Sequence, residues 1–176
     1  MLDIHSHLLP GVDDGAEDLE EACMMARSAW DTGTKGLVLT PHCNVPGGYR
    51  NPWDSALSHK LETFRQALVR LGIPLQLMMG AEVFGTDDVA LGLSSGRILT
   101  LNGGRHVLLE FWTEDQPLRV NRVLDSISAL GLVPVIAHPE RYRFVQSDLN
   151  LARQWYDRGY LLQINKGSIL GLLGRR

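Results

Sequence analysis

Polar residues of the kinds that bind metal ions stand at the ends of five short apolar segments, and this pattern limits how the chain can fold. The segments are residues 2–5, 35–42, 74–83, 106–111 and 133–140. Longer amphipathic segments separate them, so we expect parallel strands that are buried on both faces, with helices outside. The polar residues at or just past the carboxyl ends of these strands are His5, His7, His42, Glu82, Glu110 and His138.

The amphipathic segments predict four helices. Asp13, Asp14 and Gly15 precede the first of them, where helix caps are expected, and its first turn is acidic. In the third helix, Leu118 and Leu130 are expected on the apolar side. The expected helices span residues 17–32, 53–71, 116–131 and 148–158, and a sixth strand is expected at 160–165.

The alternation of strands and helices fits either a barrel or a doubly wound sheet, and the polar residues favour the barrel. In a parallel barrel all carboxyl ends of the strands meet on one face, where active sites are built. The 176 residues are long enough to bury a sizeable core and contain no linker-like segment, so we expect a single domain over residues 1–176.

Composition excludes several classes of function. The net charge of −3 gives no electrostatic reason to expect nucleic acid or an anionic membrane as a partner. No apolar run approaches the roughly 20 residues of a membrane span, and we find no secretory signal. The two cysteines, Cys23 and Cys43, do not suggest a disulfide framework, so a cytoplasmic location is expected.

The polar residues predict a metal site with more than one ion. His5 and His7 are two residues apart and therefore point to the same side of a strand. Burying all of these polar groups without a metal would cost several kcal/mol each unless they were paired. Together with Asp14 there are seven candidate ligands, too many for one tetrahedral ion, so we expect two or three ions of manganese, iron or zinc, with a bridging carboxylate. Such clusters hydrolyse phosphate esters.

The remaining histidines and the basic residues nearby are interpreted differently. His106 opens the strand that Glu110 ends, roughly 13 Å away, and is expected to bind nothing. His59 lies inside a helix. Arg141 follows His138 and is able to hold a phosphate through two hydrogen bonds, or to pair with Glu140. Lys166 is either a second phosphate contact or a surface residue.

The chain resembles the PHP (polymerase and histidinol phosphatase) superfamily over its whole length. The motifs that carry the resemblance are "DIHSHLLPGVDDGA", "TPH", "GAEV", "LLEF", "HPERY" and "INKGS", in this order. Within the superfamily it is most similar to the bacterial PHP-type protein tyrosine phosphatases of capsule and exopolysaccharide loci. This resemblance implies a TIM-like, distorted (β/α)7 barrel. It also implies a manganese-dependent hydrolase in which a metal-bridging hydroxide attacks phosphotyrosine on the tail of a membrane tyrosine kinase.

The resemblance also implies a role for each candidate site residue. Glu82 would bridge a first ion to a second, and Arg141 would contact the phosphate. The remaining ligands would be His5 and His7 for the first ion, Glu110 and His138 for the second, and Asp14 and His42 for the third.

Two departures from the family pattern affect these expectations. Where many relatives have "TPHH", this chain has "TPHCN", with Cys43 in the place of a histidine. Relatives also carry a later "SDAH"-type motif with two further ligands, which is absent before the final "GSILGLLGRR". We therefore expect a barrel that is incomplete at the C-terminus, weakened metal binding and low or absent activity. An open sheet edge would also favour association between copies.

Three other functions share some of these sequence features. A cysteine-dependent tyrosine phosphatase needs a C-x5-R loop, but Cys43 and Arg50 form C-x6-R, and Pro46 removes a backbone donor. A PHP phosphatase for a small phosphate ester, such as histidinol phosphate, would use the same residues. A remnant that binds metal or a kinase without hydrolysis is the third alternative.

Overall fold

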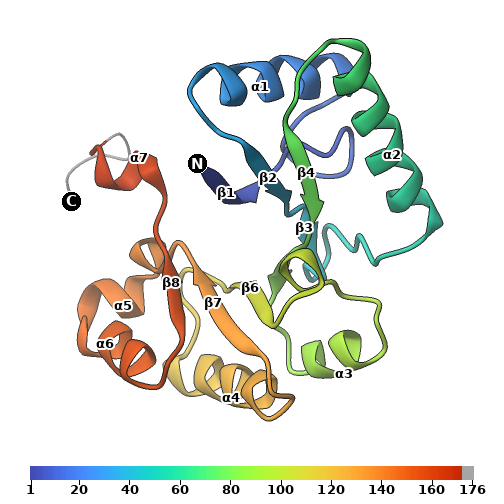
Figure 1. The fold of residues 1–176 in the computed structure, drawn as a ribbon. Coiled ribbons are helices and arrows are strands. Elements are labelled where there is room, and N and C mark those ends of the chain that lie inside the picture. Colours follow the sequence, from blue (N-terminus) through green and yellow to red (C-terminus); the bar gives the residue numbers. More distant parts are fainter. Residues whose placement is uncertain (172–176) are drawn as a thin grey trace.

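The strand pairs of this computed structural model, which describes residues 1–171, are all parallel and form two sheets (Figure 1). The strand order is β1-β2-β4 in one sheet and β3-β5-β6-β7-β8 in the other. The strands are β1 (Leu2–Ser6), β2 (Gly36–Leu39), β3 (His42–Cys43), β4 (Gln76–Met79), β5 (Glu82–Phe84), β6 (His106–Glu110), β7 (Val133–Ala137) and β8 (Leu161–Gln163). The expected α/β class with parallel strands is confirmed.

Two of the expected strands, 35–42 and 74–83, are each divided between the two sheets, so the expectation of six strands is wrong. The first becomes β2 and β3, and the second becomes β4 and β5. Pro41 lies at the first break and has no N–H to donate to a ladder. As a result, His42 and Glu82 begin the second strand of each pair, and they are direct partners in the β3–β5 register.

Helices cover the outer side of both sheets (Figure 1). The four expected helices are present as α1 (Leu19–Asp31), α2 (Ser55–Arg70), α4 (Pro117–Ser128) and α6 (Asn150–Asp157). No helix in residues 1–171 is long and apolar enough to cross a membrane. Short helices that were not expected are α3 (Val89–Ser94), α5 (Arg143–Ser147) and α7 (Lys166–Ile169), with 3-10 turns η1 (Leu101–Gly103) and η2 (Pro139–Arg141).

Aspartates cap the first two helices. The Asp18 carboxylate accepts the N–H of Glu21 at 2.9 Å, and the Asp54 carboxylate accepts the N–H of Leu57 at 2.9 Å. Each bond satisfies an N–H that the helix itself leaves without a partner. The expectation that Asp13, Asp14 and Gly15 cap the first helix is therefore wrong, because Asp18 takes that place.

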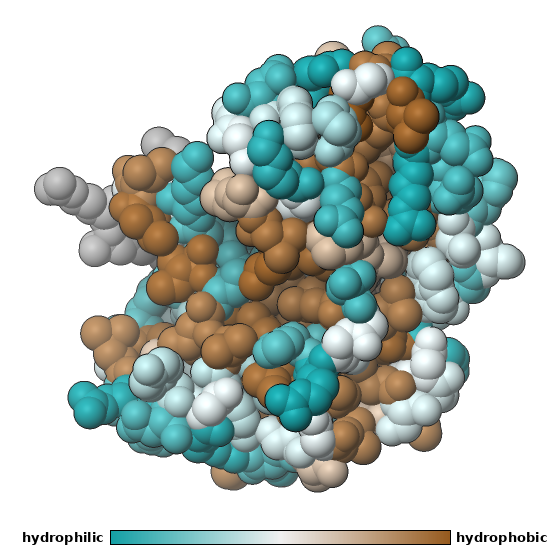
Figure 2. All heavy atoms as spheres, in the orientation of Figure 1, coloured by the Kyte–Doolittle hydropathy of each residue, from teal (hydrophilic) through white to brown (hydrophobic). Residues whose placement is uncertain are grey.

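Each sheet has its own apolar core against its helices. Leu37, Leu39 and Phe64 belong to the cluster between the three-stranded sheet and helices α1 and α2. Val83, Leu109 and Trp155 belong to the cluster of the five-stranded sheet. Figure 2 shows hydrophobic side chains across the middle of the displayed face as well. Of the residues expected on the apolar side of the third helix, Leu118 is 72% exposed and Leu130 is 42% exposed, which contradicts that part of the prediction.

The two sheets are joined where β2 leads into β3 and β4 leads into β5, and β1 and β8 are edge strands of their sheets. A hydrogen bond of 2.7 Å between His5 Nδ1 and Gln163 Oε1 joins these two outer strands. The junction therefore brings together strand ends from both sheets. Of "GSILGLLGRR", the last five residues lie outside the described part of the chain.

Candidate metal centre

Side chains from both sheets converge on one pocket of about 510 Å³ at this junction. His5 comes from β1, Glu110 from the end of β6, and His138 directly follows β7. Arg141 also reaches the pocket, from η2. All seven candidate ligands line this single space: His5, His7, Asp14, His42, Glu82, Glu110 and His138.

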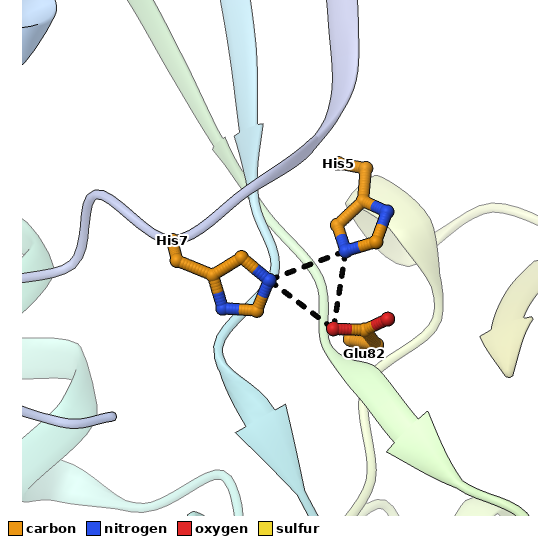
Figure 3. Close-up of side chains that lie close together, drawn as sticks. All are labelled: His5, His7 and Glu82. Carbon is orange, nitrogen blue, oxygen red and sulfur yellow. Dashed lines mark hydrogen bonds and ion pairs between the residues drawn. The ribbon is translucent and has the colours of Figure 1, made fainter. Parts of the chain in front are cut away.

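Glu82 is the centre of this arrangement. Its carboxylate is 1% exposed, and its Oε2 lies 3.1 Å from His5 Nε2 and 3.1 Å from His7 Nε2. The two nitrogens lie 3.2 Å from each other, so both rings point at the same oxygen (Figure 3). The sequence spacing of two residues thus brings both imidazoles to one point, as expected.

The hydrogen bonds of the opposite ring nitrogens show why this group fits a cation. His5 Nδ1 faces the Gln163 oxygen at 2.7 Å, and His7 Nδ1 faces Asp13 Oδ2 at 2.8 Å. With those partners each Nδ1 donates a proton, and in a neutral imidazole Nε2 then carries a lone pair. The two Nε2 lone pairs and the carboxylate oxygen of Glu82 repel one another unless a positive charge lies between them. Histidines that bind a metal through one ring nitrogen and donate a hydrogen bond through the other have this arrangement.

The protonation of the group without a metal agrees with this interpretation. Burial lowers the pKa of His7, but hydrogen bonds to Asp13 and Glu82 outweigh it and raise the pKa to about 10. Burial acts to raise the pKa of Glu82, but hydrogen bonds from His138, His5 and His7 bring it far below its usual range. Glu82 is therefore ionised, and positive charge is favoured beside it.

His42 provides two further places for a cation. Its Nδ1 lies 2.8 Å from Glu110 Oε1 and its Nε2 lies 3.4 Å from Asp14 Oδ1. Burial lowers the pKa of His42, whereas the hydrogen bond to Glu110 raises it, and the net shift is upward. Three sets of three ligand atoms within 4.8 Å of one another result: His5, His7 and Glu82; His7, Asp14 and His42; His42, Glu82 and Glu110.

His138 contacts the same central carboxylate from the other side. Its Nε2 lies 2.8 Å from Glu82 Oε1, while its buried Nδ1 has no hydrogen-bond partner among the described residues. Its backbone φ of 34° is in the left-handed region, which costs energy for a residue with a side chain. The His138 N–H donates to Gln163 O at 2.7 Å, which helps to hold this conformation.

Sequence reasoning missed the part that Asp13 takes in this site. Its side chain is fully buried and accepts three hydrogen bonds, from His7 Nδ1 at 2.8 Å, from the His42 N–H at 3.0 Å and from the Gly15 N–H at 3.1 Å. One carboxylate therefore orients two candidate ligands from separate segments. Gly15 has to be glycine because a Cβ there would lie 1.9 Å from His7 O. The one sign of this role in the sequence is that Asp13 stands next to Asp14, a candidate ligand.

The basic residues near the pocket differ from one another. Arg141 is exposed within the pocket lining and has no ion-pair partner in residues 1–171. The carboxylate of Glu140, its alternative partner, instead accepts from Ser168 Oγ at 2.6 Å and from the Asn165 N–H at 3.2 Å. Asn165 lines the pocket, whereas Lys166 does not.

Two histidines and both cysteines lie outside the candidate pocket. His106 begins β6 and His59 lies on α2, and both are exposed and absent from the pocket lining. Cys43 is 1% exposed, and burial raises the pKa of its thiol to about 12, so the thiol stays protonated near neutral pH. Cys23 and Cys43 are both free.

A comparison with known protein families shows to which family this chain belongs. The family described as "Capsular polysaccharide synthesis, CpsB/CapC" matches residues 1–176. This chain belongs to the CpsB/CapC family. It is 33% identical over 176 residues to tyrosine-protein phosphatase YwqE of Bacillus subtilis (strain 168), covering 100% of this chain and 68% of YwqE. It is 32% identical over 165 residues to tyrosine-protein phosphatase CpsB of Streptococcus pneumoniae, covering 94% and 67%.

A solved structure extends the match to three dimensions. It superposes with a TM-score of 0.92 at 32% identity, over 99% of this chain and 70% of the other. It comes from crystal structures of YwqE and CpsB, described as metal-dependent tyrosine phosphatases. The expected membership in a capsule-locus family of tyrosine phosphatases is therefore confirmed.

Proposed function

We propose that this CpsB/CapC chain is a metal-dependent protein tyrosine phosphatase whose substrate is phosphotyrosine on the tail of a membrane tyrosine kinase of polysaccharide assembly. The observation that carries the proposal is the convergence of four histidines and three carboxylates on one pocket. The relatives named as tyrosine phosphatases support the choice of reaction. The two free cysteines fit a reducing cytoplasm, where such a tail would be accessible.

In this proposal two or three ions, manganese or else iron or zinc, occupy the positions where ligand atoms converge. Glu82 would be shared between ions, His5 and His7 would hold the first, Glu110 and His138 the second, and Asp14 and His42 the third. The ligand atoms that lie within 4.8 Å of one another join Glu110 with His42 rather than with His138. Bound there, the ions would supply positive charge for the phosphoryl oxygens and acidify a water molecule. The same proposal takes the two sheets as parts of a distorted and incomplete (β/α)7 barrel, whose strand ends form the mouth of the site.

The protein's own groups prepare the site for this chemistry. Asp13 and Gln163 hold the Nδ1 protons of His7 and His5, and thereby keep both Nε2 atoms free as ligands. Arg141 stands in the pocket without an ion-pair partner in the described part of the chain, and its planar guanidinium is suited to two parallel hydrogen bonds with a phosphate. Cys43 takes no part, because its buried thiol does not ionise near neutral pH.

The experiment is phosphate release by the purified chain, with its metal content measured in parallel. Because two of the family's ligands are not found in this sequence, we expect slow release from a phosphotyrosine peptide, which depends on added manganese and exceeds release from histidinol phosphate. Glu82→Gln should lose both metal and activity, and Arg141→Ala should keep the metal but lose about 10²-fold or more in kcat/KM. His106→Ala is the matched control, because this histidine lies outside the pocket. A fully metal-loaded chain without phosphotyrosine hydrolysis would show that it is a binding remnant.

A further inference from the structure

Trp112 is a large aromatic side chain at the mouth of the candidate metal pocket that the proposed chemistry does not use. It lies two residues after Glu110 and lines the same pocket, yet it is 52% exposed. A single exposed apolar residue on a protein surface needs no explanation. An exposed indole within a few residues of a candidate ligand, in a pocket otherwise lined mostly by polar groups, does need one.

The indole of Trp112 packs against a buried aromatic ring. The Trp112 ring lies 4.5 Å from the ring of Phe84, measured between centroids, at an interplanar angle of 54°. Phe84 is only 3% exposed and belongs to β5, the strand that Glu82 begins. The aromatic pair is therefore fixed to the same strand as the central carboxylate.

The backbone around Trp112 is held on both sides. The Phe111 N–H donates to Tyr142 Oη at 3.1 Å. The Trp112 carbonyl accepts the Asp115 N–H at 3.1 Å, and the Thr113 carbonyl accepts the Arg143 N–H at 2.8 Å. This segment is thus tied to Tyr142 and Arg143, the two residues that directly follow Arg141. A fixed aromatic surface loses little conformational entropy when a ligand packs on it.

We propose that Trp112, backed by Phe84, determines specificity at this site by packing against the aromatic ring of an aryl phosphate. The inference rests on the proposed function and refines its substrate class. The phosphate of an aryl ester enters the polar part of the pocket, and the ring attached to it meets the indole at the rim. Aromatic pairs gain energy beyond the area that they bury, and an alkyl phosphate lacks this contact.

The test compares two non-hydrolysable ligands with the same head group, phenylphosphonate and methylphosphonate. Their affinities for the manganese-loaded chain are measured by isothermal titration calorimetry. We expect the wild-type chain to prefer phenylphosphonate, and Trp112→Ala to reduce that preference by about 3- to 10-fold with little change for methylphosphonate. Trp112→Phe should restore most of the preference. Tyr156→Ala is the matched control, since Tyr156 is 70% exposed on α6 and outside the pocket.

The outcomes separate this inference from the proposed function. Equal loss for both ligands in Trp112→Ala, an unchanged preference, or no preference in the wild-type chain would each overturn the role of Trp112. Preferential binding of phenylphosphonate that depends on Trp112, together with no hydrolysis of a phosphotyrosine peptide, would support the aryl contact and refute the phosphatase. Hydrolysis of the peptide together with an unchanged ligand preference in Trp112→Ala would support the phosphatase and refute the aryl contact.

Discussion

Replacing Asp13 by asparagine should weaken metal binding although Asp13 is not itself a candidate ligand. The carboxylate holds His7 Nδ1, the His42 N–H and the Gly15 N–H at the same time. Asparagine has one acceptor oxygen, so either Gly15 or the pair of His7 and His42 faces an amide NH2 group instead. In the first case His7 keeps an acceptor, but an uncharged and therefore weaker one, and in the second case its ring loses the partner that fixes its tautomer.

The expected magnitude follows from these contacts. Loss of a hydrogen bond that supports a metal-binding histidine lowers metal affinity about 10- to 100-fold. This corresponds to about 1.4–2.7 kcal/mol. Because a ligand that binds only the folded state stabilises it by mass action, the same amount is lost from the stabilisation by excess manganese. For a chain of this size, the rise in Tm on adding manganese should shrink by about 3–10 °C. One buried N–H without an acceptor should also cost the metal-free protein about 1–3 kcal/mol.

The assay is a pair of thermal melts, with excess manganese and with a chelator, together with a manganese titration by calorimetry. Asp18→Ala is the matched control: it removes the cap of α1, which should cost about 0.5–2 kcal/mol of stability, and should leave manganese affinity unchanged. If folded Asp13→Asn binds manganese as tightly as the wild type, Asp13 does not position His7 and the tautomer argument is wrong.

Three further predictions concern other parts of the chain. Cys43→Ser should retain its metal content and its phosphatase activity, because the thiol is buried and protonated; loss of activity with intact metal would implicate Cys43 in the reaction. Phe64→Ala should lower the free energy of unfolding by about 3–5 kcal/mol in urea melts without changing metal stoichiometry, since Phe64 lies fully buried in the core of the three-stranded sheet; a smaller loss would mean that the core collapses to fill the space. Burial acts to raise the pKa of Asp115, but the hydrogen bond with Arg119 brings it below its usual value. Asp115→Asn should therefore be less stable than wild type at pH 7, and the difference should shrink as pH falls below about 4, where the carboxylate becomes protonated; a difference independent of pH would contradict this.

The sequence predicts the parts of the site that depend on local pattern. His5 and His7 share a target as alternate residues of a strand do, although His7 lies one residue past the end of β1, and Glu110 follows from its place at the end of an apolar run. The division of the strands at Pro41 could have been foreseen, because proline interrupts a ladder. Its consequence, that β3 and β5 join the other sheet, depends on tertiary packing and could not.

The residues that support the site cannot be identified from the sequence, because their contacts also depend on tertiary packing. Gln163 meets His5 across 158 positions of sequence, and the hydrogen bond exists only because β8 and β1 face each other. Trp112 follows the strand that Glu110 ends, and its exposure at the pocket is a property of the folded chain that no local pattern indicates. Leu118 and Leu130 are exposed for separate reasons: at 3.6 residues per turn Leu118 lies on the side of α4 opposite the buried Ile127, and Leu130 lies past the end of α4 at Ser128.

The origin of the converging ligands has a consequence for the protein in the cell. His5 belongs to the three-stranded sheet, and Glu82, Glu110 and the residue after β7 belong to the five-stranded sheet. An ion held by both groups would act as a cross-link between the halves of the molecule, so its loss would enlarge the population of unfolded chains. Proteases of cellular quality control remove such chains. The amount of this protein, as well as its activity, should therefore follow the supply of the metal during growth.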